Sequence, residues 1–104
     1  MTYSGLKTAL EAACGCVYEW AAPAGAARFV VLSLYGARAV FGDDAVRLEL
    51  QRVQLDVCWQ RPDDTLLDDV KAALTEAYLP YRVEDVGYDD DYAAMRAIVQ
   101  LEVV

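Results

Sequence analysis

The chain has 104 residues and a net charge of −8, from 17 acidic and 9 basic side chains, and it contains no histidine. This length predicts a single domain. The excess of acid argues against a basic surface that grips nucleic-acid phosphates, and the lack of histidine removes the usual general base at neutral pH. No apolar run approaches the roughly 20 residues that a membrane-spanning helix needs.

Hydrophobic residues make up 57% of the chain, and 7 Tyr, 2 Trp and 2 Phe are more aromatic side chains than so small a domain encloses. Surplus apolar surface favours burial against a partner, so we expect self-association. The alternative is that abundant alanine inflates the hydrophobic count. The odd number of cysteines (Cys14, Cys16 and Cys58) and an N-terminus unlike a signal peptide predict reduced thiols made in a cytoplasm.

The chain opens with a predicted helix at 3–13, because apolar residues recur there at helical spacing. Thr2 is its expected N-cap, and Gly15 lies where it should stop. A short strand at 16–20 and a loop rich in Ala and Pro at 21–26 follow.

Residues 27–36 predict a strand that is apolar on both faces, typical of a central strand or of one lying against a partner. Phe29, Val31 and Ser33 face one way, and Val30, Leu32 and Leu34 face the other. Residues 37–41 continue or re-enter the sheet, and Gly42 with the next two acids makes a turn.

A long strand signal fills the middle of the chain, at 47–61, and its apolar residues change phase. Leu48 and Leu50 have the opposite parity to the set Val53, Leu55, Val57 and Trp59. One extended strand cannot bury both sets, since side chains alternate with a period of two. Either a β-bulge near Gln51–Arg52 restores the phase, or half of the strand packs on a partner subunit.

Pro62 ends this strand, and Asp63 or Asp64 caps a second helix at about 64–79 that Pro80 terminates. Strands are predicted at 81–88 and 94–104, joined by a turn at 89–91. The expected fold is α+β, a mostly antiparallel mixed sheet with two helices packed on one face. The expected interior comprises Leu6, Leu10, Phe29, Val31, Val53, Leu55, Val57, Val70, Leu74, Val99 and Leu101.

The sequence offers no catalyst, cofactor site or metal site, so we do not expect an enzyme. Two thiols in the "CGC" segment at 14–16 cannot complete a tetrahedral zinc site without further ligands. The acidic pairs and runs are explained by turns and helix caps, and neither a glycine-rich phosphate loop nor a nucleophile elbow is present.

The order of segments resembles the tail-terminator or tail-completion proteins of long-tailed (siphovirus) bacteriophages. The resemblance runs nearly end to end, through the opening helix, the short strand at Val17 and Tyr18, the Ala/Pro loop and the acidic hairpin at 42–45. The matching stretches are "YSGLKTALEAA" (3–13), "RFVVLSLYG" (28–36), "RVQLDVCWQRPDD" (52–64), "LLDDVKAALTEAYLPYRVED" (66–85) and "DYAAMRAIVQLEV" (91–103). The Ala-rich loop at 21–27 departs from the family pattern.

The resemblance implies a structural protein of the virion tail or neck, made in the host cytoplasm. Such proteins form a ring, generally of six subunits, on the head-proximal end of the tail tube, where they end tube polymerisation. The implied partners are other copies of the chain, the major tail tube protein and the head–tail connector, with DNA passing through the lumen without specific binding and no membrane involved. Candidate interface residues are Asp43, Asp44, Arg52, Trp59, Asp89, Asp90 and Asp91.

Two other classes of protein remain open at this point. One is a head-completion or neck adaptor, also a ring component, which binds the portal rather than the tube. The other is a small dimeric regulatory domain with a ligand pocket.

Overall fold

The fold, seen in a computed structural model, is α+β, as the sequence predicts. The structure describes the backbone of residues 1–42 and 45–104 and the side chains of residues 1–42 and 48–104. The elements in chain order are α1 (Tyr3–Cys14), β1 (Val17–Glu19), β2 (Arg28–Gly42), β3 (Ala45–Trp59), α2 (Leu66–Glu76), β4 (Tyr81–Asp89) and β5 (Ala94–Val103). Neither helix is long and apolar enough to cross a membrane, within the described residues.

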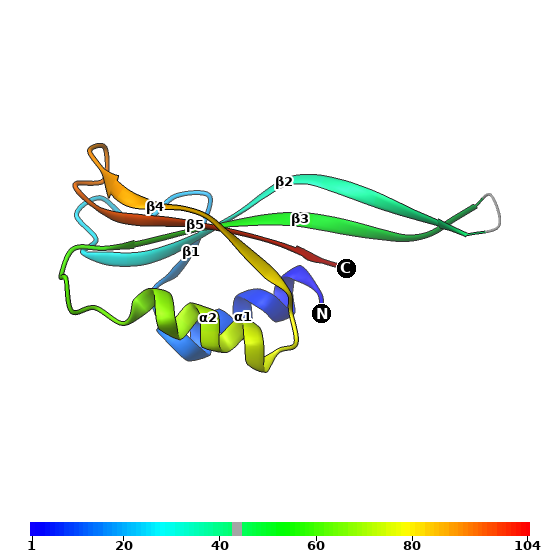
Figure 1. Ribbon diagram of the computed structural model, residues 1–104, viewed down its shortest axis with the longest axis horizontal. Helices are drawn as coiled ribbons and strands as arrows, with labels where there is room; N and C mark the ends of the chain where they lie inside the picture. The colour runs from blue at the N-terminus through cyan, green and yellow to red at the C-terminus, as the bar shows by residue number, and fades with distance from the viewer. Residues whose placement is uncertain (43–44) are drawn as a thin grey trace.

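The five strands form one sheet in the order β1-β2-β3-β5-β4. Strand β1 runs parallel to β2, and every other neighbouring pair is antiparallel. Both helices lie on the same face of the sheet, and the β2–β3 hairpin extends well beyond them (Figure 1). We call the face toward the helices the inner face and the opposite one the outer face.

Helix α1 begins and ends where the sequence predicts. The Thr2 hydroxyl accepts a hydrogen bond from the Gly5 N–H at 3.1 Å, which satisfies one of the unpaired amides of the first turn. Gly15 has a φ of 74°, a left-handed conformation that closes the helix at little cost for a residue without a side chain. Leu6 and Leu10 are fully buried and anchor the helix on the sheet.

Helix α2 is shorter at both ends than the predicted range of 64–79. The N-cap residue is Thr65, whose side chain makes no capping hydrogen bond, so neither expected residue occupies the cap position. The neighbouring Asp64 carboxylate accepts a hydrogen bond from the Leu66 N–H at 2.9 Å and supports the first turn. At the other end Tyr78 is left-handed, with a φ of 57°. The helix therefore ends at Glu76, before Pro80 can interrupt it.

The core lies between the helices and the inner face. Alternate residues of β3 and β5 point into it, and every residue of the predicted interior is buried. Phe29 and Val31, however, belong to a second, smaller cluster on the outer face, together with Cys58. Tyr18, Ala22 and Ala26 cover this cluster, so the Ala/Pro loop closes over the sheet there.

The predicted bulge at Gln51–Arg52 is wrong. Strand β3 keeps an uninterrupted register from Leu48 to Trp59, and the irregularity lies on β2, between Leu34 and Gly36, opposite Val53 and Arg52. The apolar phase of β3 is therefore not restored, and Leu48 and Leu50 stay on the opposite face from Val53. Leu48 and Leu50 do not have to be buried in the same core as Val53, because that half of the strand projects beyond the helices (Figure 1).

Candidate assembly surface

The projecting half of the β2–β3 hairpin is the most unusual feature of the molecule. Strand β5 pairs with β3 only as far as Gln51, opposite Val103. Beyond that point residues 37–42 and 45–50 have only each other as sheet neighbours, and we call this two-stranded ribbon the arm. The arm contributes to a long axis of 51 Å, against 26 and 21 Å for the other two (Figure 1).

A bulge at the base of the arm changes which way β2 presents its side chains. Tyr35 is the extra residue, because Leu34 pairs with Val53 and Gly36 with Arg52. Its side chain is 46% exposed, and so Tyr35 marks the point at which β2 leaves the core.

Apolar side chains on the arm are exposed to solvent. Phe41 is 68% exposed and Leu48 is 43% exposed, the latter on the outer face. A two-stranded hairpin is at best marginally stable in water by itself. An arm with exposed Phe and Leu is therefore suited to packing against a second surface.

The arm has an open edge along β2. Strand β1 pairs with β2 only from Val30 to Leu32, and the Trp20 N–H, bonded to the Leu32 carbonyl at 2.9 Å, makes the last contact on that side. From Ser33 to Phe41 β2 has no sheet neighbour on this edge in the described residues. Such an edge offers unpaired backbone groups to another strand.

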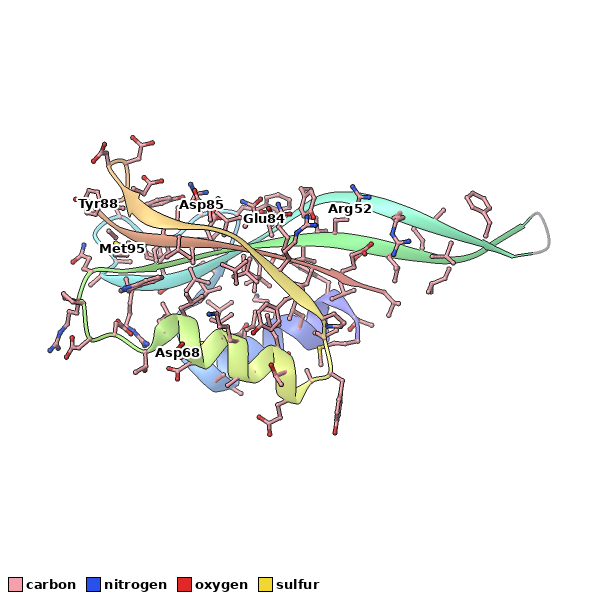
Figure 2. All side chains as sticks on the ribbon, in the orientation of Figure 1. Arg52, Asp68, Glu84, Asp85, Tyr88 and Met95 are labelled. Carbon is pink, nitrogen blue, oxygen red and sulfur yellow. The ribbon has the colours of Figure 1, made fainter. Side chains whose placement is uncertain are left out.

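Strand β4 forms the second open edge, at the far side of the sheet. Val86 and Tyr88 are 50% and 65% exposed there. Its charged residues include Glu84 and Asp85 at an irregularity in the pairing with β5. Figure 2 shows Asp85 pointing away from the helices and Tyr88 near the end of the strand.

A chain of hydrogen-bonded polar side chains crosses the outer face. Gln100 accepts from Arg82 at 3.3 Å and donates to Gln54 at 3.5 Å, and Gln54 donates to Asp56 at 3.0 Å. Arg96 then pairs with Asp56 at 3.1 Å. This half of the outer face is therefore polar and linked by hydrogen bonds, although the buried Arg96 Nε has no hydrogen-bond partner, and it differs from the apolar arm.

The predicted acidic turn at 89–91 is partly structural. Asp89 accepts hydrogen bonds from the N–H groups of Asp91 and Tyr92 and pairs with Arg96 at 3.2 Å. These donors lower the pKa of Asp89, the backbone bond from Tyr92 most strongly. Asp90 and Asp91 are exposed, so they remain available for contact with a partner.

The Arg96 side chain also fixes Tyr92 over the outer face. Its guanidinium lies 5.6 Å from the centre of the Tyr92 ring, and that ring packs edge-on against Phe29 at 5.4 Å. The turn after β4 is thereby held against the sheet.

The remaining candidate interface residues have different surroundings. Arg52 lies on the exposed outer face at the base of the arm, where its charge helps Arg38 lower the pKa of Glu102 (Figure 2). Trp59 is 9% exposed and packs in the core of its own chain, which leaves it unavailable to a partner. Asp43 and Asp44 lie outside the described residues.

A hollow of about 750 Å³ at the base of the arm is a candidate site for a small ligand. Its volume is in the range of ligand pockets, but those are mostly apolar and enclosed. This hollow opens widely to solvent and is lined in part by Arg52, Arg82 and Glu102. It does not resemble a pre-formed site for a small ligand.

The three thiols are poor nucleophiles. Burial raises the pKa of Cys14 to about 11 and that of Cys58 to about 12, so both stay protonated at neutral pH. The described residues hold no cluster of three or more His, Cys, Asp or Glu side chains that could bind a metal ion.

No model of a known protein family matches the chain, and no curated protein matches it. What the protein does is therefore inferred from its own surfaces. The open edges of the arm and β4 were missed by sequence reasoning, although the phase reversal between Leu50 and Val53 is the signal that marks the arm.

Proposed function

We propose that this protein is a ring-forming structural component of a long-tailed phage particle, placed at the head-proximal end of the tail tube. There it ends tube polymerisation and joins the tail to the head connector, and the genome passes through its lumen. The order of segments along the chain supports this proposal, through its resemblance to tail-terminator proteins.

The arm is the single observation that carries the assembly role. A ribbon with an open edge and exposed apolar side chains gains stability only when another surface covers it. A protein that acts alone has no use for such an extension, whereas a subunit of an assembly can reach a neighbour with it.

The distribution of charge agrees with assembly through the arm. Residues 36–52 contain three Arg and three acidic residues, so the rest of the chain carries the whole net charge of −8. Two acidic bodies repel one another, and the arm with its base, residues 36–52, is the segment that can approach a second copy with least repulsion.

The runner-up function is a neck adaptor that binds the portal instead of the tube. It uses the same arm and the same ring, so the two functions differ in partner rather than in mode of assembly. Binding to purified tubes separates them.

The proposal is tested by adding the purified protein to tail tubes grown from the major tail tube protein of the same particle. We expect a ring, resolved by electron cryo-microscopy at one tube end, and an arrest of tube growth. The matched control is a variant without the arm, which should do neither. If the intact protein stays monomeric at high concentration and tubes elongate unchanged in its presence, the proposed function is wrong.

A further inference from the structure

We propose that the open β2 edge of the arm pairs with the open β4 edge of a second copy of this chain, in an antiparallel, head-to-tail contact. This inference rests on the proposed ring and specifies which two surfaces join its subunits. It follows from where the backbone groups of the two edges point.

The outward groups of the arm can be traced from the hydrogen bonds of the body. The Val30 N–H donates to the Cys16 carbonyl at 2.9 Å, so Val30 faces β1 and does not exchange bonds with its partner Val57. Backbone groups alternate in direction along a strand, so every second residue of β3 from Val57, as far as Gln51 and Glu49, also points away from β2. Their partners on β2 are Ala37 and Ala39, whose amide and carbonyl groups therefore point to the open edge.

The same count identifies the outward groups of β4. Because Val57 does not exchange bonds with β2, it exchanges them with Ala97 of β5. Ala97 consequently faces β3, and Val86, opposite it on β4, faces away from the sheet. Tyr88 lies two residues further along and faces the same way.

The directions of the two edges match between identically oriented copies. Strands β2 and β5 run one way and β3 and β4 the other, because each neighbouring pair from β2 to β4 is antiparallel. The arm edge of one copy therefore meets the β4 edge of the next as an antiparallel pair. A contact between two different surfaces of the same chain repeats from copy to copy and can close into a ring.

The side chains beside these edges also agree. Ala37 and Ala39 lie on the inner face, as do Val86 and Tyr88, because their β3 and β5 partners alternate in phase with Val53 and Val99. Directly opposed residues of an antiparallel pair share a face, so the joined sheets keep their helices on one side. Small alanines on one edge and exposed Val and Tyr on the other leave room for contact.

The charges favour the contact between the arm and β4 over a symmetric contact between the β4 edges of two copies. Residues 81–92 carry five acidic side chains and one Arg, so two β4 edges repel each other. Residues 36–52, the arm together with its base, are neutral overall and include the exposed Arg52, so their approach to an acidic edge is unopposed. Pairing of two arms is the remaining symmetric alternative, and the experiment distinguishes it.

The experiment uses two proline variants of the full chain, Ala39→Pro and Val86→Pro. Each removes an N–H that points outward, so the ladder to β3 or β5 is kept while one open edge is blocked. We expect each variant alone to be monomeric by native mass spectrometry under conditions in which the unmodified protein assembles. An equimolar mixture should form a heterodimer and nothing larger, because one intact arm and one intact β4 edge remain to meet.

Ala39→Val and Val86→Ile, which keep the N–H, are the matched controls and should assemble normally. If a proline variant fails to fold by circular dichroism, Ala39→Lys and Val86→Lys replace the pair, since a lysine on an edge also opposes strand addition.

Three outcomes overturn the inference. Dimers of Val86→Pro alone, with Ala39→Pro monomeric, point to pairing between two arms. A ring that forms from either blocked variant alone refutes edge pairing and leaves the proposed ring function standing. An unmodified protein that never assembles, with or without tail tubes, refutes both.

Discussion

Asp64 connects two elements that are far apart along the chain. Its carboxylate accepts two hydrogen bonds from the Arg28 guanidinium, each 3.1 Å long, and a third from the Leu66 N–H. Arg28 begins β2, and Leu66 begins α2. The pair with Arg28 is the first cause of the lowered pKa of Asp64, and the bond from Leu66 adds to it.

Asp64→Asn is expected to lower the free energy of unfolding by about 1–2 kcal/mol at neutral pH, because charge-assisted hydrogen bonds are lost at a largely covered carboxylate. Chemical denaturation measures the change. Asp63→Asn is the control and should have almost no effect, since Asp63 pairs with Arg61 on the exposed surface.

The stabilisation by Asp64 depends on pH in a direction set by its lowered pKa. A carboxyl that is more acidic in the folded state stabilises that state fully above its unfolded pKa of 3.8, and the stabilisation disappears as the pH falls through the lower folded value. The stability gap between the unmodified protein and Asp64→Asn should therefore shrink below about pH 4. A gap that grows on acidification would contradict this assignment.

Arg96 supports the turn that follows β4. Arg96→Met should lower the free energy of unfolding by about 1–3 kcal/mol, because Asp56, whose side chain is 13% exposed, loses its cation. Amide hydrogen exchange in residues 89–93 should accelerate more than exchange in α1. Equal acceleration everywhere would show that Arg96 supports the whole fold rather than this turn.

At the scale of elements, each helix is attached to the sheet by a narrow stripe of leucine and valine. In α2 the stripe consists of Leu66, Val70 and Leu74, all fully or almost fully buried. Small alanines from both helices line the groove between the helices, on the side away from the sheet. Close approach of the helices requires short side chains there.

Leu74→Ala is expected to cost about 2–5 kcal/mol of unfolding free energy, through lost burial and the cavity left behind. Thermal or denaturant unfolding measures it, and Thr75→Ala, at the neighbouring exposed position, is the control. A cost near zero for Leu74→Ala would mean that the stripe does not carry the attachment of α2.

At the scale of the whole molecule, the body and the arm have separate tasks. The core cluster lies entirely outside residues 36–52, so the body has its own hydrophobic interior. The arm adds reach and open backbone, and little to that interior.

Replacing residues 39–49 by Asn-Gly should remove nearly all of the arm and keep the body folded. Arg38 and Leu50 are directly paired, and by the alternation counted from Val57 they exchange backbone hydrogen bonds, so a two-residue turn can join them as a tight hairpin. We expect a melting temperature within a few degrees of that of the intact protein, and complete loss of self-association by analytical ultracentrifugation. Loss of folding would show that the arm is part of the cooperative unit, and retained association would place the contact elsewhere.

The sequence by itself determined the fold class, the elements and the inner residues of β3 and β5, because these follow from local periodicity, caps and breakers. Thr2, Gly15 and the alternation from Val53 to Trp59 are of this kind. The shorter α2 was not predictable from Pro80, since a left-handed Tyr78 ends the helix earlier.

Only the tertiary structure decided what the phase reversal at Leu50 means. A strand with two apolar phases can bulge or can leave the core, and the choice depends on how far its neighbours extend. Here β5 stops at Val103 and β1 at Glu19, so the β2–β3 hairpin continues alone and the bulge falls on β2 at Tyr35. The open edges at Ala39 and Val86 likewise arise from strand order, which local patterns do not encode.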